Sequence, residues 1–132
     1  VGSEMCIRDS RYYGSGIANA YLGDEDQGQM SAWFIMAAIG LFQTDGGCQI
    51  EPVYEIASPL YEKIVLHLDN RYGRGKEFII EAKNASRQNK YVQSATLNGK
   101  KLTSFKFPAV ELLKGGSLVL EMGEKPNKNW GK

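Results

Sequence analysis

Three acidic residues stand in consecutive positions, Asp24-Glu25-Asp26, shortly before an apolar run from Met30 to Leu41. Like charges a few ångströms apart repel one another and raise one another's pKa, so such a triplet is costly to hold together. A carboxylate in or just before the first turn of a helix accepts free backbone N–H groups, and the helix dipole favours its ionised form. An ionised carboxylate suits a general base, which takes a proton from water at neutral pH.

Asp24 and Asp26 lie two residues apart and point the same way in an extended or turn segment, so they can share one water. We expect Glu25, Gln29 and Ser31 to bind the substrate, with Gln29 and Ser31 able to hydrogen-bond its hydroxyls or the base. Two other interpretations stay open. The acidic triplet also fits a solvated helix entry, where carboxylates act as caps, and Gln29 and Ser31 fit a capping role equally well.

The composition limits the class of protein. The chain has 132 residues, of which 42% are apolar and 11% aromatic, enough for the core of one small domain. The formal net charge is +1 with the two signs interspersed, so we expect no nucleic-acid partner. The longest apolar run, Met30 to Phe42, is too short to cross a bilayer, and we expect no membrane span. Cys6 and Cys48 offer no disulfide framework.

Residues 1–10 have neither an amphipathic period nor an apolar signal-peptide core, and they resemble the translation of a sequencing-library adapter. We interpret them as a non-native segment. The chain would then begin at Arg11 as a break in a longer protein. We therefore expect a fragment whose N-terminal portion is missing.

The elements that must position the acidic residues fall into two parts. Apolar residues recur at helical spacing from Met30 to Leu41, and other apolar residues fill the remaining faces, which predicts a helix buried inside a larger assembly. After the turn at Asp45-Gly46-Gly47, short strand patterns alternate with turn signals, among them the hairpin dipeptide Asn98-Gly99. This pattern favours an antiparallel sandwich or jelly-roll-like module.

The stretch Gly23-Asp24-Glu25-Asp26-Gln27-Gly28-Gln29-Met30-Ser31-Ala32-Trp33 resembles a motif of the family 92 glycoside hydrolases, the exo-acting α-mannosidases. The likeness covers roughly residues 21–131 in collinear order. Its further segments are residues 38–42, 58–63, 80–84, 89–99, 114–116 and 121–127.

The resemblance implies a large enzyme in which a β-sandwich packs on an (α/α)6 barrel, with this chain as the C-terminal end. It implies calcium-dependent hydrolysis of terminal α-mannosides of glycans with inversion, which needs a general acid and a general base on opposite faces of the sugar. Asp26 matches the family's general base and Asp24 its helper, although many members carry Asn at the position of Asp24. The general acid is a glutamate upstream of the motif, and no calcium ligand is assigned within this sequence.

We therefore predict an α+β fragment. Residues 11–45 would hold the terminal helix of an (α/α)6 barrel, and residues 46–132 an antiparallel β-sandwich-like module. The parent enzyme would be periplasmic or extracellular by resemblance, and the fragment alone would be inactive. The alternative is a non-catalytic carbohydrate-binding or interaction module that binds sugar on exposed aromatics such as Tyr72 or Phe105.

Overall fold

The computed structural model describes residues 26–132. The predicted site residues Asp24 and Glu25, and the segment 1–10, lie outside the described residues. The elements in chain order are η2 (Asp26–Gly28), α2 (Gln29–Ile39), β1 (Leu41–Phe42), β2 (Val53–Ile56), β3 (Lys63–His67), β4 (Glu77–Lys83), β5 (Tyr91–Leu97), β6 (Lys100–Leu102), β7 (Lys106–Pro108), α3 (Ala109–Leu113) and β8 (Gly116–Gly123).

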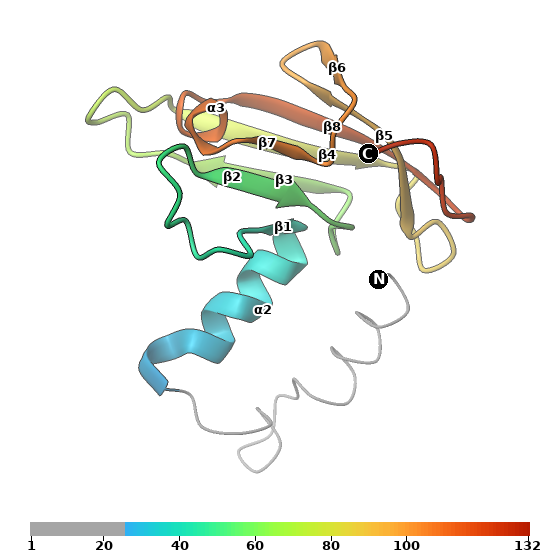
Figure 1. Ribbon diagram of the computed structural model, residues 1–132, viewed down its shortest axis with the longest axis horizontal. Helices are drawn as coiled ribbons and strands as arrows, with labels where there is room; N and C mark the ends of the chain where they lie inside the picture. Colours follow the sequence, from blue (N-terminus) through green and yellow to red (C-terminus); the bar gives the residue numbers. More distant parts are fainter. Residues whose placement is uncertain (1–25) are drawn as a thin grey trace.

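Strands dominate the described residues, with α2 projecting from one side of them (Figure 1). One sheet has three strands in the order β1-β2-β7, and the other has five in the order β3-β4-β8-β5-β6. The fold class is α+β, as predicted. The further prediction that α2 is a barrel helix concerns parts of a larger protein and stays a prediction.

The antiparallel prediction is wrong for one strand pair. β8 runs parallel to β4, with Phe78 opposite Gly116 and Lys83 opposite Glu121. The other pairs among the described strands are antiparallel, including the predicted hairpin in which β5 and β6 flank Asn98 and Gly99. Parallel neighbours need a long crossover, and here the whole segment from β5 to α3 provides it.

The core lies between the two sheets. Inward-facing residues alternate along β4, where Phe78, Ile80 and Ala82 are buried. Phe107 of β7 brings the smaller sheet into contact with the larger one, because its ring stacks on that of Phe78 with centroids 6.3 Å apart. The two sheets therefore share one hydrophobic core, which also includes Leu41 of β1.

Helix α2 is shorter than the predicted run to Leu41. It ends at Ile39 because Gly40 adopts a left-handed conformation with φ 80°, a C-cap that glycine accepts without strain. Leu41 then begins β1 and pairs with Ile56 of β2. The predicted domain boundary after residue 45 thus falls between two paired strands of one sheet.

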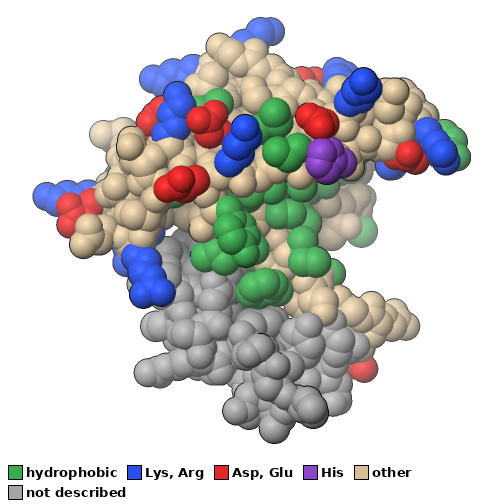
Figure 2. Space-filling model, turned by 180° about the vertical axis from the view of Figure 1, so that it is seen from behind, with side chains coloured by type: hydrophobic (Ala, Val, Ile, Leu, Met, Phe, Trp, Pro, Cys, Tyr) green, Lys and Arg blue, Asp and Glu red, His purple; other side chains and the backbone are tan. Residues whose placement is uncertain are grey.

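Much of the apolar surface of α2 is exposed. Only Ala37 and Ala38 of the helix are buried, whereas the side chain of Ile35 is 56% exposed. Apolar side chains gather below the charged outer surface of the strands (Figure 2). The large exposed apolar residues include Trp33 and Ile35 of α2, Leu60 and Tyr61 between β2 and β3, and Val65 of β3. Within residues 26–132, no helix is both long and apolar enough to cross a membrane.

Candidate functional site

Asp26 lies at the free end of α2, in the short turn η2 that precedes the helix. Gln27 and Gly28 follow with φ values of 56° and 78°, so two successive left-handed residues separate Asp26 from the regular helix. The Asp26 side chain is exposed. No ion pair of the described residues involves it. Asp26 is therefore exposed to solvent at the N-terminal end of α2.

Asp26 is not the N-cap of α2, although it lies in the first turn of the short helix η2. The N-cap of α2 is Gly28, which has no side chain, and α2 has no acidic residue in its first turn. Two residues with positive φ turn the backbone between Asp26 and the N-cap, so Asp26 does not start α2. An exposed carboxylate in η2 fits both the general base and the solvated helix entry, and both stay predictions.

Gln29 is the first residue of α2 and is exposed, whereas Ser31 is the third residue of α2 and is half-buried. Residues two apart on a helix do not face each other, so the helix directs Gln29 and Ser31 to different sides. Of the pair, Gln29 is the one whose side chain reaches solvent at the same end of the helix as Asp26. The role of each in substrate binding stays a prediction.

Glu55 of β2 forms the most connected charged cluster of the described residues. Its Oε1 atom accepts a hydrogen bond from Lys106 Nζ at 2.9 Å and another from Thr44 Oγ1 at 3.1 Å. The hydrogen bond from Lys106 is the main cause that holds the pKa of Glu55 below its ordinary value. These contacts join β2 to β7 and to the loop after β1, which indicates a structural role.

Calcium dependence stays a prediction, and no calcium ligand is assigned among the described residues. Asp45 Oδ2 is a buried carboxylate oxygen without a hydrogen-bond partner. However, within residues 26–132 no three histidine, cysteine, aspartate or glutamate side chains come together around a common point.

The aromatic residues named for a sugar-binding module do not form one platform. Tyr72 is 94% exposed in the loop between β3 and β4. Phe105 is half-buried, and the Lys106 ammonium lies over its ring at 5.2 Å from the centroid, so Phe105 is not an exposed sugar platform. The prediction that Phe105 is an exposed aromatic is therefore wrong. Trp33 has a ring contact with Phe42, edge to face, with centroids 6.1 Å apart.

Residues 6–124 match the family described as the glycosyl hydrolase family 92 catalytic domain. This match covers most of the sequence, and the chain belongs to that family. A fungal relative from Arthroderma benhamiae, described as an uncharacterized secreted glycosidase, is 32% identical over 111 residues. Those residues make up 83% of this chain and 13% of the relative.

Solved structures of the same family share the fold. The family GH92 inverting mannosidase BT2199 from Bacteroides thetaiotaomicron is 36% identical, with a TM-score of 0.77 over 98% of this chain and 17% of that protein. The family GH92 α-mannosidase BT3965 from the same organism is 30% identical, with a TM-score of 0.81 over 98% of this chain and 16% of that protein. The chain thus spans about one sixth of the length of these relatives.

Proposed function

We propose that this chain is the C-terminal part of an inverting exo-α-mannosidase that hydrolyses terminal α-mannosides of glycans, and that it supplies the general base, Asp26. The observation that carries the proposal is the placement of Asp26: it is exposed at the tip of α2, before the N-cap residue Gly28 and outside any ion pair of the described residues. The family and the mannosidase activity named for two solved relatives support the substrate class.

In the proposed reaction the Asp26 carboxylate takes a proton from a water molecule as the water oxygen forms a bond to the anomeric carbon of mannose. The glycosidic bond breaks at the same time, and its electron pair goes to the leaving oxygen. A general acid outside this chain protonates that oxygen. Asp24 would assist Asp26 by orienting the water, as the resemblance implies. Because water attacks from the face opposite the leaving group, the configuration inverts.

The apolar surface of α2 fits a helix that packs inside a larger enzyme. Side chains such as Ile35 and Trp33 remain exposed on a helix that is apolar nearly all round, a pattern typical of buried helices. In the proposal, the missing N-terminal portion of the same protein covers this surface as an (α/α)6 barrel. The β-strands brace the helix from the other end.

Two further properties belong to the proposal. Calcium dependence is implied by the resemblance and would act through residues outside those described. An extracellular or periplasmic location of the parent enzyme has the support of one relative described as a secreted glycosidase.

The proposal is tested on the parent enzyme with Asp26→Ala. We expect kcat for an α-mannoside to fall by about 10²- to 10⁴-fold, the usual contribution of a general base, while the circular dichroism spectrum is unchanged. Asp69→Ala is a matched control, because Asp69 is also an exposed aspartate but lies in the loop after β3. Turnover in Asp26→Ala equal to that of Asp69→Ala would refute the base assignment.

Two more measurements complete the test. NMR of the first-formed mannose distinguishes inversion from retention, and retention would contradict the proposed mechanism. Chelation of calcium should abolish turnover, and readdition should restore it. If the parent enzyme cleaves no mannoside at all, the non-catalytic carbohydrate-binding module becomes the better interpretation, with the exposed Tyr72 as its first residue to test.

A further inference from the structure

The end of α2 opposite Asp26 is held by backbone hydrogen bonds from the loop between β2 and β3. The Ala57 N–H donates to Gly40 O at 2.8 Å, and the Leu60 N–H donates to Ala38 O at 2.9 Å. The last carbonyl groups of a helix have no partner within the helix, so these bonds satisfy groups that would otherwise need water. The loop 57–60 therefore holds the C-terminal turn of α2 on the β-module.

Gly40 and Pro59 make this junction tight. A Cβ atom at position 40 would lie 2.7 Å from the nitrogen and 2.9 Å from the Cα of Pro59, and 3.0 Å from the carbonyl oxygen of Ala57. These are backbone and ring atoms, which cannot move aside as a flexible side chain can. The φ of 80° at Gly40 also disfavours any side chain. Only glycine allows α2 and the loop 57–60 to approach this closely.

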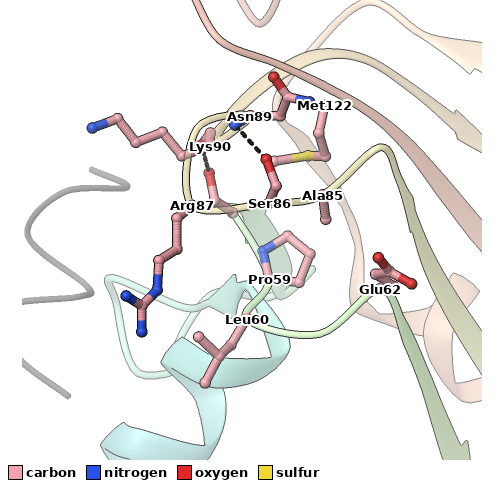
Figure 3. A pocket seen from close by; sticks show the side chains of 10 residues that line it. Pro59, Leu60, Glu62, Ala85, Ser86, Arg87, Asn89, Lys90 and Met122 are labelled. Atoms are coloured by element: carbon pink, nitrogen blue, oxygen red, sulfur yellow. Dashed lines mark hydrogen bonds between the residues drawn. The ribbon is translucent and has the colours of Figure 1, made fainter. Parts of the chain in front are cut away.

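Ser58 ties the same loop to the larger sheet. It is a buried polar residue, 8% exposed, and its hydroxyl donates to the carbonyl oxygen of Lys90 in the segment before β5. Figure 3 shows Pro59 and Leu60 beside the end of α2, with the loop that carries Ser86, Asn89 and Lys90 on their other side. The junction is thus continuous from α2 through the loop 57–60 to the five-stranded sheet.

We propose that Gly40 and Ser58 are positioning residues for the base: through the loop 57–60 they set the direction of α2, and thereby the place of Asp26. This inference rests on the proposed function of Asp26. Helix α2 has 11 residues and is therefore about 16 Å long at 1.5 Å per residue. A tilt of about 4° at Gly40 would move the far end of the helix by about 1 Å. A displacement of about 1 Å in a reacting group can cost about 100-fold in rate.

The test uses Gly40→Ala in the parent enzyme. We expect kcat to fall by about 10- to 100-fold with KM changed by less than about threefold, because the substrate pocket remains while the base is displaced. Gly99→Ala is the matched control: Gly99 has a φ of 79°, so alanine meets the same backbone strain, but nothing lies within 4 Å of its added Cβ. We expect Gly99→Ala to lower the melting temperature and to leave kcat unchanged at temperatures where both variants are folded.

Ser58 gives an independent test if Gly40→Ala does not fold. Ser58→Ala should lower kcat several-fold, and Ser58→Thr, which keeps the hydroxyl, should restore it. Ser58 lines a cavity of about 140 Å³, so we expect the threonine methyl group to be accommodated. Equal kcat values for the wild type, Ser58→Ala and Ser58→Thr would overturn the positioning role of Ser58.

A double-mutant cycle separates this inference from the proposed function. If Gly40 acts through Asp26, Gly40→Ala should have no further effect on kcat in the Asp26→Ala background. If Gly40→Ala causes only a general structural loss, the fold-reductions in kcat of the two single variants should multiply in the double variant. If Asp26→Ala loses about 10²- to 10⁴-fold in kcat and Gly40→Ala matches Gly99→Ala in kcat, the positioning role is refuted and the base assignment stands. If Asp26→Ala retains wild-type turnover, the proposed function itself fails.

Discussion

Truncation of Phe107 should weaken the packing between the two sheets and lower the free energy of unfolding. Its side chain is 1% exposed, and its ring lies between those of Phe78 and Tyr54, with centroid distances of 6.3 and 5.9 Å. Truncation of a buried phenylalanine to alanine costs about 3–5 kcal/mol through lost burial and the cavity left behind. Each aromatic contact adds about 0.5–1.5 kcal/mol. We expect Phe107→Ala to lie at the upper end of that range, about 4–5 kcal/mol.

Urea unfolding of the 132-residue chain, followed by tryptophan fluorescence, measures the free energy of unfolding. Because a loss of 4–5 kcal/mol approaches the whole stability of a small domain, Phe107→Leu provides a milder variant, with an expected loss of about 1–2 kcal/mol. Tyr72→Ala is the control, because Tyr72 is 94% exposed and its truncation should change stability by less than about 0.5 kcal/mol.

The coupling between the sheets is measured by a double-mutant cycle of Phe107→Leu with Phe78→Leu. We expect a coupling energy of about 0.5–1.5 kcal/mol between these rings. Additive losses, or a loss in Phe107→Leu no greater than in Tyr72→Ala, would refute the conclusion that the two sheets share one core through Phe107.

Two further predictions concern polar contacts. Because the pKa of Glu55 is lowered in the folded state, Glu55→Gln should lower the free energy of unfolding at neutral pH. The difference in unfolding free energy from wild type should shrink as pH falls below about 4.3, the ordinary glutamate pKa. A difference that is independent of pH would contradict this. Asn98→Ala removes the hydrogen bond from Ser117 N to Asn98 Oδ1 at 2.8 Å and puts alanine at a φ of 48°, so we expect a loss of about 2 kcal/mol in urea unfolding. Asn98→Gly, which relieves the backbone strain only, should lose less; an equal loss would mean that the φ at position 98 contributes nothing.

The local elements could be predicted from neighbouring residues alone. The apolar run after Gly28 predicted α2, and Asn98-Gly99 predicted the hairpin between β5 and β6, because both depend on local periodicity or on the φ > 0 that a two-residue turn requires. The motif around Asp26 also identified the family, which the match over residues 6–124 confirms. These signals are carried by neighbouring residues and need no long-range contact.

The way in which these elements pack together depends on long-range contacts that the local sequence pattern does not show. Nothing in the local pattern of β8 indicates that it pairs parallel to β4, since strand direction depends on the path of the long crossover between them. The sequence showed Gly40 after an apolar run, a C-cap signal, yet the prediction continued the helix to Leu41. The close approach of Pro59 and the hydrogen bond of Ser58 to Lys90 join segments 19 and 32 residues apart, and such contacts follow from packing rather than from sequence spacing.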